Sequence, residues 1–284
     1  MRRISCDSWP LCSILILSLS GVGSAQTPQT INIVAVTQSA DFSTGLSQPG
    51  SLSSIFVTGL QGSQGIIVAM KYPLPNELAG ISVWIDSLPA PILAVAFFDG
   101  YQQINLQVPW EARFPPKVVK VAQNGIDAQT SDVLGVLGWS VFFADANGYG
   151  IVQHALDYSL VTPLNPAHPG EYLIAYAGNL GPVSNQPATG SPAPFNPLAE
   201  SIPVGFPGCI GDVANLVQIG QDVYVAPTYI GLTPGSVGLY QVNFQLPSSV
   251  SAGDLPMSFL HHISGPPAVC YMTSFSRSVL LPVR

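Results

Sequence analysis

Hydrophobic residues along the chain occur in short runs rather than in long amphipathic stretches. Runs rich in Val, Ile, Phe and Tyr recur at intervals of about ten residues, and Gly, Pro, Asn and Asp separate them. No segment keeps apolar residues at the helical spacing of three and four over several turns. The pattern therefore predicts an all-β fold.

Three dipeptides predict tight hairpins between these runs. Asn-Gly and Asp-Gly favour two-residue turns because both central residues of a type I′ turn need a positive φ. We expect Asp99-Gly100 to join Ile92–Phe98 to Gln103–Val108, Asn124-Gly125 to join Val118–Gln123 to Ala128–Val136, and Asn147-Gly148 to join Ser140–Ala144 to Gly150–His154.

Two segments of the chain recur in the same order. Residues 49–60 match residues 169–180 at a shift of 120, and residues 103–109 match residues 241–247 at a shift of 138. Two copies in one order indicate two homologous units. We therefore expect two tandem β-sandwich domains, over residues 26–138 and 139–284.

The second match contains a row of three amides in each unit. Each row alternates with apolar residues, so its amides lie on one face of a strand. The rows are Gln103, Asn105 and Gln107, and Gln241, Asn243 and Gln245. We expect these side chains to hydrogen-bond the backbone of neighbouring loops in both units, and a polar ligand groove is the alternative.

The first 25 residues have the pattern of a secretory signal peptide. Met1-Arg2-Arg3 is basic, Leu11–Val22 is apolar, and Gly23-Ser24-Ala25 supplies small residues before a cut at Gln26. The apolar run is shorter than the roughly 20 residues that cross a bilayer as a helix. We expect an exported protein with no transmembrane segment after cleavage. A lipid anchor at Cys12 is an alternative with a poorer match.

Charged residues make up only 8% of the chain, and the net charge is −7. Six Lys or Arg follow residue 25. Because binding to nucleic acid needs a basic surface, nucleic acid is excluded as a partner.

Two cysteines remain after signal cleavage, Cys209 and Cys270. Disulfides persist outside the cytoplasm, so we expect one disulfide between them, closing a loop of about 60 residues and contributing roughly 4 kcal/mol. A buried free pair and a metal site with His261 or His262 are the alternatives. The chain lacks the closely spaced ligands of a zinc site, and we expect no metal or cofactor.

Motifs of catalysis are missing from the sequence. It contains neither the G-x-S-x-G of serine hydrolases nor a Gly-rich phosphate loop. A glycosidase needs two carboxylates about 5–10 Å apart, whereas the acidic residues here are scattered. We expect Asp99 and Asp145 to be turn residues, and Glu111 and Glu171 to face solvent or pair locally. We expect His154 and His168 to be single surface or half-buried histidines without a catalytic role. Calcium at residues 145–148 has only a weak ligand pattern.

Exposed aromatic side chains are the remaining candidates for ligand binding. A non-catalytic sandwich binds sugars on flat aromatic rings, which makes Trp84, Trp110 and Tyr101 candidate ligand-binding residues. Core or interdomain packing is the competing interpretation, above all for Trp110 and for Trp139 near the boundary.

The repeated segments also resemble a known family. Gln38–Phe42, Pro49-Gly50, Gln103–Glu111 (QINLQVPWE) and Gly238–Pro247 (GLYQVNFQLP) are similar to the Solibacter-type C-terminal domain of secreted acidobacterial proteins. The resemblance covers nearly the whole chain from about residue 32 and implies two immunoglobulin-like β-sandwiches and export. It brings no established activity, and the family domain often follows other β-repeats, whereas here it follows a signal peptide almost directly.

Together these features predict a non-enzymatic, secreted or cell-surface-associated interaction or structural module. Its partner would be a protein or polysaccharide of the cell envelope. A polysaccharide-binding module is the alternative function, followed by a glycan hydrolase. Because the chain has few charges to protect its edge strands, we also expect self-association through a sheet edge.

Overall fold

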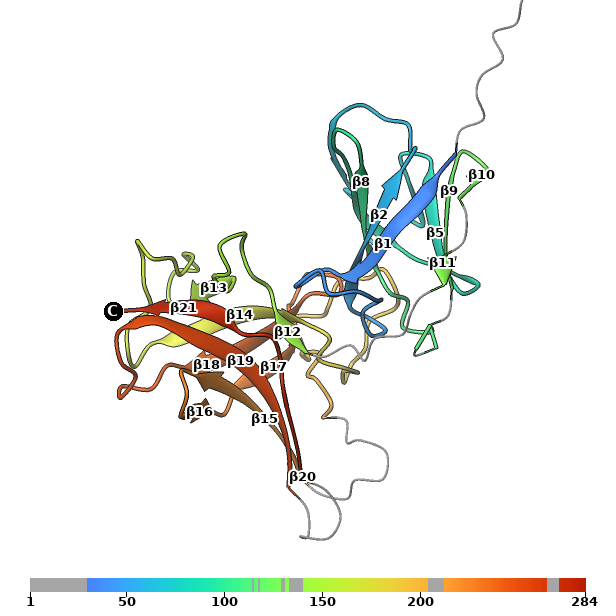
Figure 1. Cartoon of the computed structure of the whole chain (residues 1–284). Coiled ribbons are helices and arrows are strands. Elements are labelled where there is room, and N and C mark those ends of the chain that lie inside the picture. Colours follow the sequence, from blue (N-terminus) through green and yellow to red (C-terminus); the bar gives the residue numbers. More distant parts are fainter. Residues whose placement is uncertain are drawn as a thin grey trace, which may run out of the picture.

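The computed structural model describes residues 30–113, 115–116, 118–128, 131–132, 140–203, 212–264 and 271–284. These residues contain strands and turns but no helix, and every strand pair is antiparallel. The predicted all-β class is confirmed. The N-terminal half (residues 30–132) and the C-terminal half (residues 140–284) form two neighbouring lobes (Figure 1).

The strands of the N-terminal half form two sheets. Sheet A has the order β1-β2-β8-β7-β3, and sheet B has the order β10-β9-β5-β4, with β11 on β9 and β6 on β5. The strands of sheet A are β1 (Asn32–Gln38), β2 (Leu52–Thr58), β3 (Gly65–Val68), β7 (Ile92–Phe97) and β8 (Gln102–Gln107). Those of sheet B are β4 (Glu77–Leu78), β5 (Ile81–Ile85), β6 (Leu88–Pro89), β9 (Val118–Gln123), β10 (Ile126–Asp127) and β11 (Ser131–Asp132).

The C-terminal half also has two sheets. Sheet C has the order β12-β14-β18-β17, with β13 on β14, and sheet D has the order β16-β15-β19-β20, with β21 on β19. Sheet C consists of β12 (Val141–Phe142), β13 (Val152–His154), β14 (Tyr172–Gly178), β17 (Tyr229–Leu232) and β18 (Tyr240–Gln245). Sheet D consists of β15 (Asp212–Ile219), β16 (Val223–Val225), β19 (Gly253–Ser264), β20 (Tyr271–Phe275) and β21 (Val279–Val283).

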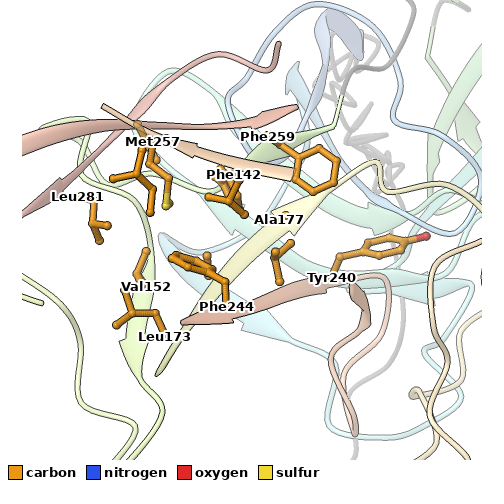
Figure 2. Packing of buried hydrophobic residues seen from close by; sticks show 14 of the residues in the cluster. Phe142, Val152, Leu173, Ala177, Tyr240, Phe244, Met257, Phe259 and Leu281 are labelled. Atoms are coloured by element: carbon orange, nitrogen blue, oxygen red, sulfur yellow. The ribbon is translucent and has the colours of Figure 1, made fainter. Parts of the chain in front are cut away.

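Each half has its own hydrophobic core, to which both of its sheets contribute. Alternation along the strands creates these cores, because every second side chain points to the same face. In β18, Tyr240, Val242 and Phe244 are fully buried. Figure 2 shows Tyr240 and Phe244 of this strand packed with side chains of β14, β19 and β21 in the C-terminal core. The arrangement is that of a β-sandwich.

The predicted hairpins are present, with differences in their turns. At Asn124-Gly125 both φ angles are positive, 51° and 80°, as a type I′ turn requires. At Asp99-Gly100 only the glycine has a positive φ, although Phe98 N donates to Tyr101 O at 3.0 Å and closes the turn.

The third predicted hairpin, at Asn147-Gly148, closes through a slightly longer turn. Asp145 N donates to Tyr149 O at 2.8 Å, and the strands on either side of the turn, β12 before it and β13 after it, both pair with β14. Of the strand predicted at residues 128–136, the structure describes residues 128, 131 and 132, and β11 (Ser131–Asp132) lies within it.

The sequence repeat corresponds to a repeated strand pairing. In the N-terminal half, β2 pairs with β8 so that Ser54 faces Asn105. In the C-terminal half, β14 pairs with β18 so that Ile174 faces Asn243. Ser54 and Ile174 are 120 residues apart, and Asn105 and Asn243 are 138 residues apart, which are the two shifts of the sequence repeat. The two strand pairs therefore have the same register. The predicted repeat is thus present in the sheets.

The amide rows hold the loop before the repeated strand in both halves. Gln107 Nε2 donates to Gly50 O at 3.0 Å, and Gln245 Nε2 donates to Gly170 O at 2.8 Å. Gly50 and Gly170 occupy matching repeat positions, and both have a positive φ. The expected bonds from amides to loop backbone are therefore confirmed at this position of the rows.

A buried asparagine joins the two halves. Asn179 lies just after β14, and its Oδ1 accepts a hydrogen bond from Gln48 N at 2.9 Å. Its Nδ2 donates to Gln38 Oε1, and its backbone N donates to Ser51 Oγ at 3.1 Å. Gln38, Ser51 and Asn179 are all buried. These bonds fix the end of sheet C against the loop between β1 and β2.

A second contact between the halves lies at the end of β8. Gln107 Oε1 accepts a hydrogen bond from Gly190 N at 2.7 Å, and Gly190 O accepts one from Leu74 N at 2.8 Å. Because Gln107 is fully buried, this contact is shielded from water. The halves therefore meet through specific polar contacts.

Candidate functional site

The outer face of sheet A carries a group of aromatic and amide side chains. Phe56 in β2 faces Gln103 in β8 across the strand pair, and Ser54 faces Asn105 on the same side of the sheet. The residues between them, Ile55 in β2 and Ile104 in β8, are buried in the core, so alternation directs these four side chains away from it.

Four aromatic rings form a continuous row on this face. The ring centroids of Phe42 and Phe56 are 5.9 Å apart, those of Phe56 and Tyr101 are 6.2 Å apart, and those of Phe98 and Tyr101 are 5.2 Å apart. Phe42, Phe98 and Tyr101 are 54%, 41% and 44% exposed. We call these four residues the aromatic row. Such exposed neighbouring rings are uncommon on a soluble surface unless a ligand or partner covers them.

Local hydrogen bonds hold Phe42 in the aromatic row. Asp41 Oδ1 accepts bonds from Ser43 N at 3.0 Å and from Ser43 Oγ at 2.7 Å, and Phe42 N donates to Gln38 O. Phe42 has a φ of 56°, in the left-handed region, which directs its ring toward Phe56. The turn therefore brings a distant ring to the strand pair.

Beside the aromatic row lies a pair of linked amides. Asn105 Oδ1 accepts a bond from Gln103 Nε2 at 2.8 Å and another from Ser54 Oγ at 2.9 Å. In this arrangement Gln103 Oε1 and Asn105 Nδ2 have no partner among the residues that the structure describes. One acceptor and one donor are thus held in place and left for a ligand.

The corresponding face of the C-terminal half has a different character. Gln241 Nε2 donates to Asn243 Oδ1 at 3.2 Å, which repeats the amide pair. Tyr176, at the position of Phe56, instead donates its hydroxyl to Gln153 Oε1 at 2.6 Å, and burial raises its pKa. The aromatic row therefore distinguishes the N-terminal half.

Of the three predicted ligand-binding aromatics, Tyr101 belongs to the aromatic row. Trp84 lies on the outer face of sheet B, where Lys120 Nζ stands 5.1 Å from its ring centroid and also pairs with Asp127 at 3.0 Å. Lys120 therefore covers one face of the Trp84 ring, and that face is not free for a sugar to stack on.

Trp110 packs between the halves, as the packing interpretation expects. It is partly buried against the core of the C-terminal half, and its backbone N donates to Thr189 Oγ1 at 3.0 Å. The ring lies flat against Gly50, since a Cβ at Gly50 would stand 2.1 Å from Trp110 Cη2. Glu111 is exposed and accepts a bond from Thr189 at 2.7 Å. Trp139 lies outside the described residues.

The candidate acid and base residues have local structural contacts. Asp145 Oδ1 accepts bonds from Asn147 N and Tyr149 N, as the turn interpretation predicts. Glu171 Oε2 lies 2.9 Å from His154 Nδ1, and its Oε1 accepts a bond from His168 N at 2.6 Å. Each contact organises a loop of the C-terminal half.

A shallow pocket of about 300 Å³ lies beside β17. Its lining includes Glu200, Asn215, Thr228 and Tyr229. Burial, assisted by the Glu200 carboxylate, raises the pKa of Tyr229 to about 12. Glu200 is the one carboxylate among the described lining residues, whereas a glycan hydrolase needs two.

Three further results concern metals, membranes and cysteines. Within the described part of the chain, no three His, Cys, Asp or Glu residues gather as metal ligands would. None of the described segments forms a helix long and apolar enough to cross a membrane. Cys209 and Cys270 lie outside the described residues, as does the segment 1–25, so the disulfide and the signal peptide stay predictions.

No protein-family model matches the chain, and no curated protein matches it. The resemblance to the Solibacter-type domain therefore stays a prediction from the repeated motifs.

Proposed function

We propose that the chain is an exported, non-enzymatic binding module of two immunoglobulin-like β-sandwiches, and that the aromatic row with its amide pair binds the ligand. One observation carries this proposal. Four neighbouring rings, of which Phe42, Phe98 and Tyr101 are exposed and Phe56 is half-buried, lie beside a free amide acceptor and a free amide donor on one sheet face. Exposed aromatics held on a rigid sheet are typical anchors of a binding surface.

The chemistry of the aromatic row favours a neutral polysaccharide as the ligand. The apolar C–H face of a sugar ring stacks on an aromatic ring, and its hydroxyls pair with amides. The side chains of the row and of the amide pair carry no charge, so a charged ligand would gain no ion pair from them. An extended row of rings suits a chain of repeating units better than a single small molecule, which favours a concave pocket.

Export agrees with this function. A polysaccharide of the cell envelope or its surroundings would be reached only by a secreted or surface-associated protein, as residues 1–25 predict. The C-terminal half would then support the N-terminal half, because Asn179 bonds Gln48 of the N-terminal half and Trp110 packs against the core of the C-terminal half.

The test is depletion of the protein, from residue 26 onward, by insoluble cellulose, chitin and xylan. We expect at least one of these probes to remove the protein from solution. Tyr101→Ala should weaken that binding about tenfold, since loss of a well-placed aromatic contact costs more than about 1 kcal/mol. Gln103→Ala should weaken it less, because it removes hydrogen bonds but no stacking surface.

Tyr158→Ala is the matched control, because Tyr158 is 65% exposed on a turn of the C-terminal half. Circular dichroism would check that all variants are folded. Equal binding by Tyr101→Ala and Tyr158→Ala, or no depletion by any polysaccharide, would contradict the proposal. A protein partner that binds the aromatic row would contradict the polysaccharide as ligand but keep the row as the binding surface.

A further inference from the structure

β3 is an unprotected edge strand of sheet A. It pairs with β7 on one side and lies last in the order β1-β2-β8-β7-β3. All four of its residues are exposed, with Ile66, Ile67 and Val68 at 64%, 41% and 49%. A row of apolar side chains along an open sheet edge is a template for pairing with another strand.

The pairing with β7 determines which backbone groups of β3 are free. Ala69 N donates to Leu93 O at 2.9 Å, so Ala69 belongs to the residues bonded to β7. Because hydrogen-bonded and non-bonded pairs alternate in an antiparallel ladder, Ile67 also bonds β7, whereas Ile66 and Val68 direct their N–H and C=O groups outward.

The opposite edge of sheet A has protection that β3 lacks. β1 contains an irregularity between Ile33 and Ala35, and a bridge from Thr37 to Thr44 covers its end. Bulges and covering loops are common ways to block an edge. Gly65–Val68 contains no charge and no proline.

We propose that β3 pairs antiparallel with β3 of a second copy of this chain, about a two-fold axis at Ile67. In this register Ile66 of each copy faces Val68 of the other, and the outward groups of both residues form hydrogen-bonded pairs. Ile67 faces its own counterpart in a non-bonded pair. The result is one continuous sheet made of sheet A from both copies.

The strand is complementary to itself, which is why the occupant is a second copy. The register places Ile66 against Val68, two branched apolar side chains on the same face, as stable cross-strand pairs require. It also places Lys71, the nearest charge, opposite Ser63 of the other copy, so the two lysines are kept apart. A two-fold interface of this kind closes and does not continue into a fibre.

The pairing has a consequence for the binding surface. A two-fold axis perpendicular to the sheet puts the outer faces of both copies on the same side. The two aromatic rows would therefore face one surface, and a repetitive ligand would bind a dimer more tightly than a monomer. The dimer itself does not depend on what the aromatic row binds.

The experiment measures the mass of the chain from residue 26 by sedimentation equilibrium up to about 1 mM, where weak dimers are populated. Val68→Pro removes an outward N–H, and an edge strand tolerates that change. Val68→Lys adds an edge charge. We expect a dimer whose dissociation constant rises about tenfold or more in both variants. Val34→Lys, on the opposite edge, is the control and should dimerise normally.

A cysteine tests the register. Ile67→Cys should give a disulfide-linked dimer under mild oxidation, because non-bonded antiparallel pairs have Cα atoms about 4.5 Å apart. Val34→Cys and the unmodified chain should stay unlinked. A strict monomer at about 1 mM, a dimer unaffected by Val68→Lys, or linking by Val34→Cys as fast as by Ile67→Cys would overturn the proposal.

Discussion

Replacing Asn179 by glycine tests whether its buried side-chain bonds to Gln38 and Gln48, which we call the joint, hold the two halves together. Glycine keeps the backbone, because Asn179 has a φ of 62° and glycine adopts that region freely. The change removes the side-chain bonds to Gln48 N and to Gln38 Oε1. It therefore isolates the contribution of the side chain from that of the turn.

We expect Asn179→Gly to lower the free energy of unfolding by about 3 kcal/mol. The two lost hydrogen bonds account for about 1 kcal/mol each, and the buried Gln38 amide, left without this partner, adds about 1 kcal/mol more. Glycine has two further effects on the free energy of unfolding. Its greater freedom in the unfolded chain lowers this free energy, whereas its easier positive φ raises it by a similar amount.

Urea unfolding, followed by circular dichroism and tryptophan fluorescence, measures this loss. A change of about 3 kcal/mol shifts the midpoint by about 1 M or more. Because the joint lies between the halves, we also expect the two probes to separate into two transitions.

Asn185→Gly is the matched control. Asn185 also has a positive φ, 45°, but it is exposed and its Nδ2 donates to Leu198 O within the C-terminal half. Its replacement should cost less than about 1 kcal/mol. If the two variants lose stability to within about 0.5 kcal/mol of each other, and Asn179→Gly still unfolds in one transition, the joint between the halves is refuted.

Three further predictions follow from buried groups. Gly50→Ala should lower the free energy of unfolding by about 3 kcal/mol, because its Cβ would stand 2.1 Å from the Trp110 ring. Gly170→Ala has a similar φ but meets no atom, so it should lower the free energy by only about 1 kcal/mol, and equal melting temperatures of the two variants would contradict this. Tyr240→Phe should cost about 1 kcal/mol in urea unfolding, because its buried hydroxyl donates at 2.6 Å; an unchanged midpoint would contradict it. Burial raises the pKa of Tyr240, so its contribution to stability should be constant below about pH 10 and fall above it, where the unfolded chain loses the Tyr240 proton first. Tyr240→Phe should therefore reduce the fall of the urea midpoint between about pH 9 and about pH 11.5, and an identical slope in both proteins would contradict this.

Local patterns along the chain predicted much of the fold. The all-β class, the turns at Asp99-Gly100 and Asn124-Gly125, and the repeated strand pairing follow from alternation, turn residues and the two sequence shifts. All of these depend on residues close in sequence or on an internal match, which a single chain displays.

The candidate site was predicted only in part. Tyr101 was identified as an exposed aromatic, but Phe42, Phe56 and Phe98 were not. Their rings come from separate segments and meet only when the turn at Asp41 returns toward β2. Alternation around Phe56, between buried Ile55 and Val57, was the available signal.

The edge strand and the joint were also not identified in advance. Gly65–Val68 is a continuous apolar run, which ordinarily indicates a buried strand, yet its place at the end of sheet A leaves it exposed. Asn179 resembles an ordinary turn residue in sequence. Its partners Gln38 and Gln48 lie more than a hundred residues away, so only the packing of the two halves reveals its contacts.

Asn179 occupies the repeat position of Gly59, and both residues have a positive φ. In one copy the position is a simple turn, and in the other the same backbone carries a side chain that reaches the neighbouring lobe. Once a unit is duplicated, a left-handed turn position accepts asparagine in place of glycine with little change in backbone. A substitution of this kind adds a side-chain link between two tethered copies, alongside the contacts made by Gln107 and Trp110.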